Sequence, residues 1–303
     1  MISVIICSRG PAYRAEVTDN IAATIGVPYE LVVVDNSANQ YGICAAYNEG
    51  AARSRYEVLC FAHEDIEFRT PGWGAIVAEI LRDTSIGVLG TAGGKWLAKV
   101  PSSWWGCGPE HLSINLHDAS RDGQFSKTTF SQPEGQPLAD VAAVDGLWLC
   151  TRKQVWAQFP FDAHTFPDFH FYDVDFCASV LARYRVCVTF RVDITHFSRG
   201  NFNDSWYVNA DRFYRKHAHR LPLGTVAVSG PAGRERDYLG CLGFVLEIMK
   251  RQLPPRLGYP YLARCLALKP FSRDTLWLLR QYAKFAGRTR SGRPAGAGHR
   301  HEK

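Results

Sequence analysis

The sequence predicts an α/β fold, in which a mostly parallel central sheet is flanked by helices and followed by a C-terminal helical extension. Three observations support this prediction. The first ninety residues alternate short apolar runs with amphipathic stretches, as parallel strands joined by crossover helices require. Hydrophobic residues make up 46% and charged residues 21% of the 303 residues, which excludes collagen-like, coiled-coil and wholly disordered chains. Basic residues concentrate beyond residue 250, where apolar residues recur at helical spacing.

The N-terminal part of the chain predicts four strands separated by three helices. The apolar runs that suit buried strands lie at residues 2–7, 30–35, 58–62 and 86–90. Segments with apolar residues at helical spacing lie between them, at residues 12–25, 43–52 and 72–83. A helix between successive strands is the pattern of βαβ units, so we expect these four strands to be parallel.

Regular periodicity is lost between residues 91 and 140, where Gly, Pro, Ser and Trp interrupt the pattern. We expect a long irregular segment here, and connections of this length inside a domain usually carry function. Beyond it the sequence predicts regular structure at residues 141–151, a helix at 171–183, a strand at 185–192 and a helix at 205–217.

Composition divides the chain into four parts. We expect an α/β domain over residues 1–221, a Pro-, Gly- and Ser-containing linker over 222–234, a basic helical extension over 235–290 and a disordered tail over 291–303. The net charge is +6, but 13 basic and only 2 acidic residues lie between Lys250 and Lys303. The rest of the chain is therefore mildly acidic.

Cysteine usage and the N-terminus favour a cytoplasmic protein. The nine cysteines are scattered and never form Cys-x-x-Cys, so they predict buried thiols rather than a zinc site or a disulfide framework. The chain opens at Met1 directly into an apolar run, without the basic segment of a secretory signal. The longest apolar stretch near the end, residues 239–249, is about half the length that a membrane crossing needs.

The basic C-terminal region has three interpretations. It docks peripherally on anionic lipids at the inner face of a membrane, it contacts a polyanionic acceptor, or it is a solvated helical face. We favour peripheral docking, because clustered Lys and Arg side chains hold a protein at an anionic surface without crossing it. Nucleic acid is not an expected partner, because the body of the chain is acidic and no recognised motif accompanies the basic region.

Polar residues end three of the apolar runs, where an open parallel sheet binds its ligands. These endings are Ser8-Arg9, Asp35-Asn36-Ser37 and His63-Glu64-Asp65. No Gly-x-Gly-x-x-Gly follows the first run, and Gly93-Gly94-Lys95 is followed by Trp instead of Ser or Thr, which argues against a Rossmann dehydrogenase and a Walker ATPase. A divalent cation held by Asp and His side chains is another way to bind a diphosphate.

Seven short segments form a joint pattern that is more specific than any one of them. They are Ile2-Ser-Val-Ile-Ile-Cys-Ser-Arg9, Val33-Val-Asp35-Asn36-Ser37, Gly42-Ile-Cys-Ala-Ala-Tyr-Asn48-Glu-Gly50, Phe61-Ala-His63-Glu64-Asp65, Asp145-Gly146, Phe171-Tyr-Asp173-Val-Asp175-Phe and Thr195-His196. In this order, over about residues 2–217, the chain resembles the metal-dependent family-2-type glycosyltransferases of the GT-A fold. The Gln-x-x-Arg-Trp signature of processive synthases is absent, which favours the transfer of a single sugar.

The resemblance implies a role for each site residue. His63 and Asp65 would occupy the two ends of the metal-binding Asp-x-Asp motif, with His in place of the first Asp, and His196 would complete the metal site. Asp173 would be the catalytic base, and Asp35 would contact the nucleotide base. The other residues that we assign to substrate binding are Ser8, Arg9, Asn36, Asn48, Trp104, Asp145, Gly146 and Asp175.

The chemistry of sugar transfer calls for these residue types. Negative charge grows on the departing diphosphate, and a cation held by Asp65 and His196 neutralises it. The acceptor hydroxyl loses a proton as it attacks, and a carboxylate such as Asp173 accepts it. Plain structural roles remain as alternatives: a turn at residues 35–37, a solvated loop at 63–65, a structural His196, helix capping by Asp168 or Asp173, and core packing of the tryptophans.

The sequence therefore predicts a metal-dependent inverting glycosyltransferase with Mn²⁺ or Mg²⁺ as cofactor. We expect it to act in polysaccharide biosynthesis and to move one sugar from a nucleoside-diphosphate sugar, with UDP as the expected nucleotide, to a glycan or lipid-linked acceptor. Two alternatives are a sugar nucleotidyltransferase and a non-catalytic GT-A-like glycan-binding or scaffold protein. The first is disfavoured because no Gly-rich, basic loop follows the first strand to hold a triphosphate.

Overall fold

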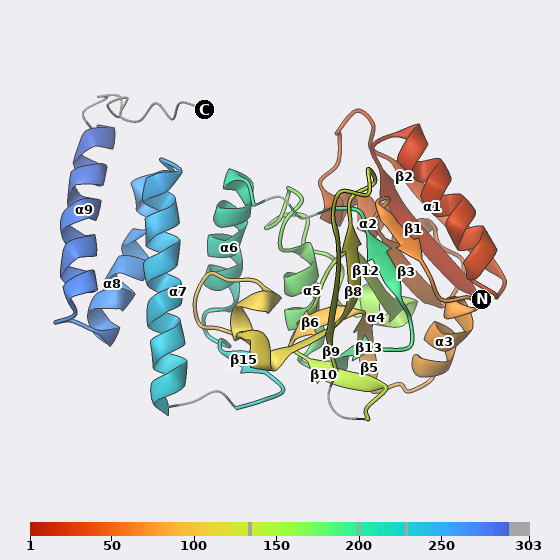
Figure 1. The fold of residues 1–303 in the computed structure, drawn as a ribbon. Helices are drawn as coiled ribbons and strands as arrows, with labels where there is room; N and C mark the ends of the chain where they lie inside the picture. Colours follow the sequence, from red (N-terminus) through yellow and green to blue (C-terminus); the bar gives the residue numbers. More distant parts are fainter. Residues whose placement is uncertain (133–134, 199, 201, 228–229, 291–303) are drawn as a thin grey trace. The chain divides into compact units, whose positions relative to one another are not determined.

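Seven strands form the central sheet of the first of two units in a computed structural model of the chain, which describes residues 1–132, 135–198, 200, 202–227 and 230–290 (Figure 1). The first unit is Met1–Ala227, and the strand order of its sheet is β10-β13-β5-β12-β3-β1-β2. The strands are β1 (Ile2–Ser8), β2 (Tyr29–Asp35), β3 (Val58–Ala62), β5 (Ile86–Gly90), β10 (Leu138–Val141), β12 (Trp148–Arg152) and β13 (Arg185–Thr189). All except β10 and β12 run parallel, which confirms the predicted α/β fold.

Helices cover the central sheet closely. In this unit they are α1 (Pro11–Thr24), α2 (Ile43–Arg53), α3 (Trp73–Ile80), α4 (Lys153–Gln158), α5 (Tyr172–Val180) and α6 (Asp204–His217). Strands β5 and β12 are buried along their whole length, which explains why buried strands of this sheet appear in the sequence as uninterrupted apolar runs. At Gly50 of α2, a Cβ atom would lie 2.3 Å from Ile5 Cγ2, so the missing side chain lets α2 approach β1.

The expectation of an irregular segment at residues 91–140 is wrong, because this stretch contributes three strands to a second, six-stranded sheet. The order of that sheet is β11-β6-β8-β14-β4, with β9 paired to β8. Its strands are β4 (Ile66–Phe68), β6 (Ala92–Gly94), β8 (Leu112–Ala119), β9 (Ser126–Ser131), β11 (Ala143–Val144) and β14 (Ile194–His196). Strand β8 lacks a clear apolar pattern because Ser113 and Asn115 are buried, and the Asn115 amide donates to the Val192 carbonyl at 3.0 Å.

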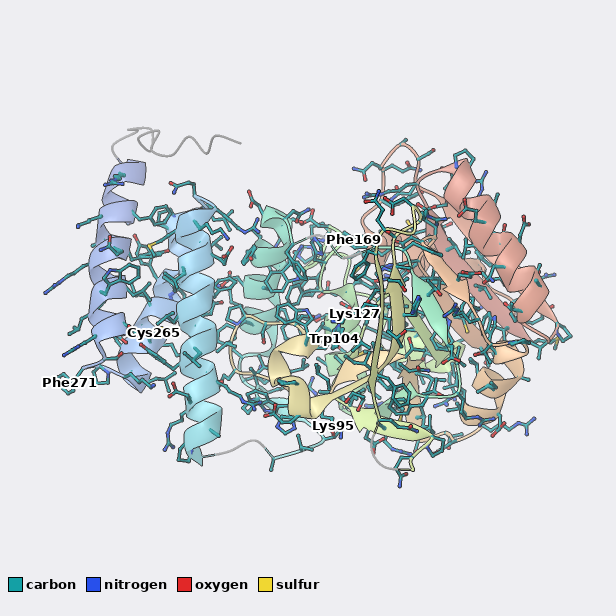
Figure 2. The ribbon with its side chains drawn as sticks, in the orientation of Figure 1. Lys95, Trp104, Lys127, Phe169, Cys265 and Phe271 are labelled. Atoms are coloured by element: carbon teal, nitrogen blue, oxygen red, sulfur yellow. The ribbon has the colours of Figure 1, made fainter. Side chains whose placement is uncertain are left out.

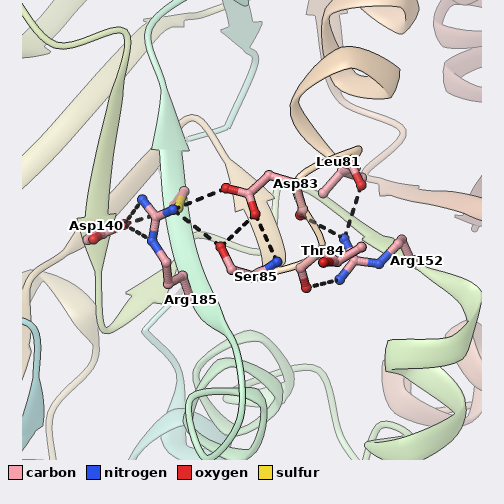
Figure 3. Close-up of polar contacts among 8 residues, drawn as sticks. Leu81, Asp83, Thr84, Ser85, Asp140, Arg152 and Arg185 are labelled. Atoms are coloured by element: carbon pink, nitrogen blue, oxygen red, sulfur yellow. Dashed lines mark hydrogen bonds and ion pairs between the residues drawn. The ribbon is translucent and has the colours of Figure 1, made fainter.

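Two arginines hold the turn after α3 against the central sheet (Figure 3). The buried Arg152 of β12 donates to three main-chain carbonyl groups within residues 81–84, at 2.9 to 3.2 Å. Arg185, the first residue of β13, donates to Asp140 at 2.8 and 3.0 Å and to Asp83 at 3.3 Å. The guanidinium of Arg152 thus satisfies carbonyl groups near the C-terminal end of a helix, which lack partners within it.

The end of the first unit differs from the linker expected at residues 222–234. Strand β15 (Leu223–Gly224) pairs with β7 (Trp96–Leu97), and helix α7 (Gly230–Lys250) already begins within that range. The Thr225 amide also donates to the Lys95 carbonyl at 2.9 Å. Residues 222–225 therefore belong to the first unit by their hydrogen bonds.

The second unit, Val228–Lys303, consists of helices over its described part. Helices α7, α8 (Tyr259–Leu268) and α9 (Arg273–Arg290) pack against one another, and a short 3-10 helix, Pro255–Leu257, contacts all three. The rings of Phe244 and Tyr261 lie 4.8 Å apart between α7 and α8, and the Tyr282 hydroxyl of α9 donates to the Pro255 carbonyl at 2.5 Å. The tail expected at residues 291–303 lies outside the described residues. Among the helices described, none has the length and apolar character needed to span a membrane.

Candidate active site

Three potential metal ligands meet beside the ends of β3 and β14. His63 follows directly after β3, Asp65 lies two residues further on, and His196 is the last residue of β14. Antiparallel pairing places His196 opposite Ile66 of β4, and the Phe197 amide donates to the Asp65 carbonyl at 2.8 Å. As a result, one ligand atom from each of the three side chains lies within 4.8 Å of the others.

A cavity of about 1000 Å³ opens at this cluster. His63 and Asp65 line it, together with Arg9 and Asn36 from the ends of β1 and β2 and Phe197, the neighbour of His196. The cavity thus lies at the carboxyl ends of parallel strands, where open α/β sheets bind their ligands. Its volume is at the upper end of the range of about 300–1,000 Å³ in which proteins enclose a small organic molecule or cofactor.

Hydrogen bonds set the orientation of the His63 ring. Its Nε2 lies 2.6 Å from the Tyr172 hydroxyl, and this hydroxyl donates its single proton to the Gly146 carbonyl at 2.8 Å. The hydroxyl therefore accepts from His63, so Nε2 carries the proton and Nδ1 keeps its lone pair. Burial lowers the pKa of His63 although Asp65 opposes this, and Nδ1 lies 3.7 Å from Asp65 Oδ1. A neutral ring with a free nitrogen toward Asp65 suits metal ligation.

His196 lies between two carboxylates. Its Nε2 is 3.8 Å from Asp65 Oδ2, and its Nδ1 is 3.5 Å from Asp118 Oδ1. Burial acts to lower the pKa of His196, but the hydrogen bond with Asp118 and the charge of Asp65 outweigh burial and raise it. A carboxylate behind a histidine orients the ring and strengthens its ligating nitrogen. Sequence reasoning missed Asp118, because it lies on β8, in the stretch expected to be irregular.

Asp173 is held close to this cluster at the start of α5. It is half-buried in the first turn of the helix, and its Oδ2 accepts a hydrogen bond from the Gly146 amide at 3.0 Å. Burial and the nearby charge of Asp145 raise the pKa of Asp173 to about 7. The same Asp145 charge acts on His63 and His196. Asp173 and the ligand cluster therefore occupy one region of the unit.

Asp145 and Gly146 support this region from behind. Asp145 Oδ1 accepts from the Leu147 amide at 2.9 Å, and the main chain of Gly146 binds both Asp173 and Tyr172. A Cβ atom at Gly146 would lie 2.1 Å from the Tyr172 hydroxyl oxygen, so only glycine leaves room for that hydroxyl. Neither residue contributes to the lining of the cavity.

The loops after β1 and β2 contribute Arg9 and Asn36 to the cavity lining, but Asp35 is not among the lining residues. The Asn36 side chain donates to the Tyr41 carbonyl and accepts from the Tyr41 amide, both at 2.9 Å, and it lines the cavity. Asp35 is exposed beside it, and hydrogen bonds from Ser37 lower the pKa of its carboxylate. The Arg9 amide donates to Glu64 at 3.1 Å, and both residues line the cavity.

Four of the expected substrate-binding residues are engaged elsewhere. Asp175 is buried and bound by Lys216 at 2.8 Å and His217 at 2.7 Å. The Asn48 side chain holds the main chain of residue 161. Trp104 and Ser8 are buried, and these four residues are absent from the cavity lining. The structure therefore does not bring them to the cavity.

Phe169 is an aromatic residue of the cavity wall that sequence reasoning missed. It is 42% exposed, and its ring centroid lies 5.5 Å from that of His63 (Figure 2). The turn between β8 and β9 adds Ser120, Arg121 and Asp122 to the lining. The Asp122-Gly123 pair is a turn signal that could have located this turn from the sequence.

Comparisons with known proteins bear on the family and the fold of the chain. A family model described as "Glycosyltransferase like family" matches residues 3–219. A search of curated proteins gives no match. The crystal structure of S. aureus TarS 1-349 in complex with UDP-GlcNAc is similar at 11% identity with a TM-score of 0.53, over 97% of this chain and 93% of that chain. This likeness concerns the fold, which is that of GT-A glycosyltransferases.

Two further solved structures have TM-scores of 0.48 and 12% identity. One is the mannosyltransferase PcManGT from Pyrobaculum calidifontis in complex with GDP-Man and Mn²⁺, over 94% of this chain and 85% of that chain. The other is GalNAc-T7 with UDP, GalNAc and Mn²⁺, over 97% of this chain and 58% of that chain. The family match extends over nearly all of the unit that contains the cavity, so the chain belongs to the glycosyltransferase-like family and is a glycosyltransferase.

Proposed function

We propose that the protein is a metal-dependent inverting glycosyltransferase that moves one sugar from a UDP-sugar to a hydroxyl group of a glycan or lipid-linked acceptor. The observation that carries this proposal is the meeting of His63, Asp65 and His196 at the edge of a large cavity. Arg9 and Asn36 on the same cavity provide a cationic and an amide group for a nucleoside diphosphate. TarS, which has a similar fold, is in complex with UDP-GlcNAc, and this supports UDP as the nucleotide.

The donor set fits a divalent cation. Ligand atoms that share one ion at bonds of about 2.0–2.2 Å lie no more than about 4.4 Å apart. Asp65 Oδ1 lies 3.7 Å from His63 Nδ1 and Asp65 Oδ2 lies 3.8 Å from His196 Nε2, so each carboxylate oxygen satisfies this limit toward one histidine. Two imidazoles with one carboxylate favour Mn²⁺ over Mg²⁺, which prefers an all-oxygen set. Such an ion, when bound, would neutralise the charge that develops on the leaving diphosphate.

Asp173 is the proposed general base. Its pKa of about 7 leaves a large fraction ionised at neutral pH and able to accept the proton of the acceptor hydroxyl. The Gly146 amide and the first turn of α5 hold the carboxylate in place. Direct attack by the activated hydroxyl displaces the diphosphate from the opposite face of the sugar, which inverts the anomeric configuration.

Asp168 is the competing carboxylate, because it lines the cavity, whereas Asp173 is not among the lining residues. Arg212 and Asn209 donate hydrogen bonds to its Oδ2 at 3.4 and 3.3 Å, so this carboxylate is already engaged by two side chains. We therefore expect Asp173→Asn to abolish sugar transfer while UDP binding persists. The matched variant Asp168→Asn should retain transfer. The reverse pattern would move the base to Asp168.

Phe169 is proposed to bind the acceptor. Its ring forms an exposed wall beside His63, and a flat aromatic face suits the apolar side of a sugar ring. Replacement by Ala should raise the KM for the acceptor with little change in the KM for the donor, and Phe169→Tyr should restore it. Equal effects on both substrates would contradict this role.

A binding and turnover experiment separates the three functions that the fold allows. Calorimetry with UDP and Mn²⁺, followed by incubation with a panel of UDP-sugars and acceptors, should give metal-dependent binding and release of UDP. Release of pyrophosphate from a nucleoside triphosphate would instead identify a nucleotidyltransferase. No metal-dependent nucleotide binding would favour a glycan-binding scaffold.

A further inference from the structure

The outward side of α9 carries a stripe of basic residues around one tryptophan. Arg273, Trp277, Arg280, Lys284 and Arg288 are all exposed and follow one another at intervals of four, three, four and four residues. This spacing places them on one face of the helix. The only acidic residue of α9, Asp274, falls outside the stripe.

The opposite face of α9 supports the unit. Thr275, Leu278, Tyr282 and Phe285 are buried, and their intervals of three, four and three residues define the packed side of the helix. Tyr282 is fixed further by its hydrogen bond to the Pro255 carbonyl. The buried face already packs α9 against the rest of the unit. Packing therefore does not explain why Leu276 and Trp277 lie on the exposed side of the helix.

Exposed apolar side chains surround the beginning of α9. Phe271, in the turn before the helix, is 93% exposed, and Figure 2 shows it at the outer edge of this unit. Leu276 and Trp277 in the first turns are 46% and 52% exposed. Large apolar side chains this exposed cost solubility unless a partner covers them, and here they cluster beside basic residues.

The described part of the second unit carries an excess of positive charge. Residues 230–290 contain 12 Lys or Arg and 4 Asp or Glu. A second copy of the chain is therefore a poor occupant of this face, because a symmetric pair would place one basic stripe against the other. An anionic lipid surface fits better: it attracts the Lys and Arg side chains, and its interfacial layer accepts Trp, Phe and Leu.

We propose that the outward face of α9, with Phe271 in the preceding turn, docks the enzyme on the surface of a membrane that contains anionic lipids. Phe271, Leu276 and Trp277 enter the headgroup layer, and the basic stripe contacts lipid phosphates. The docking is peripheral, since α9 lies along the surface rather than across the bilayer. This docking is independent of the sugar transfer proposed above, and it adds an anionic membrane as a partner that the active-site residues do not indicate.

Vesicle flotation of the purified full chain tests this proposal without relying on activity. We expect binding to vesicles with about a third phosphatidylglycerol, little binding to pure phosphatidylcholine, and release when salt rises from about 0.1 M to about 1 M. Arg280→Gln with Lys284→Gln should weaken binding at least about tenfold, since each basic residue contributes roughly fivefold at low salt. Phe271→Ala with Trp277→Ala should weaken it several-fold even at low salt.

Matched controls make the result decisive. Arg53→Gln with Arg82→Gln removes two exposed basic residues of the first unit and should leave flotation unchanged. Circular dichroism should show that the α9 variants keep their helix content. Equal flotation of all variants, or flotation independent of anionic lipid, would overturn the proposal. Two other results would also overturn the proposal and assign the face to another partner. One is failure to float together with a dimer in sedimentation that depends on Trp277. The other is failure to float together with oligonucleotide binding that depends on Arg280.

Discussion

The Tyr172 hydroxyl lies 2.6 Å from His63 Nε2 and determines which nitrogen of that ring faces Asp65. Because the hydroxyl donates to Gly146, it accepts from the histidine and leaves Nδ1 as the nitrogen with a free lone pair for a metal ion. The candidate metal site thus depends on three residues from separate motifs of the sequence, which are His63, Gly146 and Tyr172.

Removal of the Tyr172 hydroxyl should weaken metal binding. Tyr172→Phe keeps the ring but releases His63, and loss of such a support typically lowers metal affinity about 10–100-fold. Calorimetric titration with Mn²⁺ measures the effect. Tyr238→Phe is the matched control, because it removes another buried hydroxyl, bonded to Thr275 at 3.0 Å in the second unit. Equal Mn²⁺ affinity in both variants would contradict the role of Tyr172.

Asp118 should influence the metal site through His196. Asp118→Asn removes the carboxylate that raises the pKa of His196, so both this pKa and the affinity for Mn²⁺ should fall, the latter about 10-fold or more. Histidine resonances in NMR follow the pKa, and calorimetry follows the metal. Asp193→Asn, an exposed neighbour that accepts from Asn115 at 2.8 Å, should change neither.

The raised pKa of Asp173 sets the direction of the pH dependence. A base with a pKa of about 7 is protonated below that pH, so kcat/KM should fall about tenfold per pH unit in the acidic range and level off above pH 7. A steady-state profile with saturating Mn²⁺ measures this. A profile that stays flat down to pH 5 would remove Asp173 from the proton transfer.

Asp173 should also lower the stability of the folded protein at alkaline pH. The unfolded carboxyl group ionises near its ordinary pKa of 3.8, whereas the folded one does so near 7, so ionisation penalises the native state as pH rises between these values. Asp173→Asn should therefore raise the free energy of unfolding at pH 8, by about 1–2 kcal/mol after allowance for partial exposure. At pH 4 thermal unfolding should show no gain. Destabilisation at pH 8 would contradict this account.

Asp175 should matter for stability rather than for binding. Its buried carboxylate pairs with Lys216 and His217, and removal of one partner from a buried ion pair costs about 3–5 kcal/mol. Asp175→Asn should lower the unfolding midpoint in urea while the KM for the donor stays constant. In Asp168→Asn, which breaks an exposed pair with Arg212, the loss should stay below about 1 kcal/mol. A changed KM in Asp175→Asn would return Asp175 to the substrate site.

The parts of this fold that depend on local sequence could be predicted. Strands β3 and β5 coincide with their apolar runs, and His63 and Asp65 could be assigned because they directly follow a buried strand. Of the three candidate metal ligands, only these two are close together in the sequence.

The remaining site residues depend on contacts between distant segments. Asp118 reaches His196 only through the pairing of β8 with β14, and β8 carries buried polar residues that obscure its alternation. Trp104 and the adjacent Trp105 are alike in the sequence, yet the first is 8% and the second 42% exposed, because a short 3-10 helix turns them apart. Neither difference leaves a periodic signal.

Calorimetry of UDP binding with and without Mn²⁺, in the native protein and in Asp65→Asn, tests the central claim most directly. Asp65 contacts both histidines of the cluster, so its amide variant should lose most of the Mn²⁺-dependent affinity for UDP while the fold is retained. Strong UDP binding is expected only for the native protein with Mn²⁺. Equally strong binding without metal, or in the variant, would contradict it.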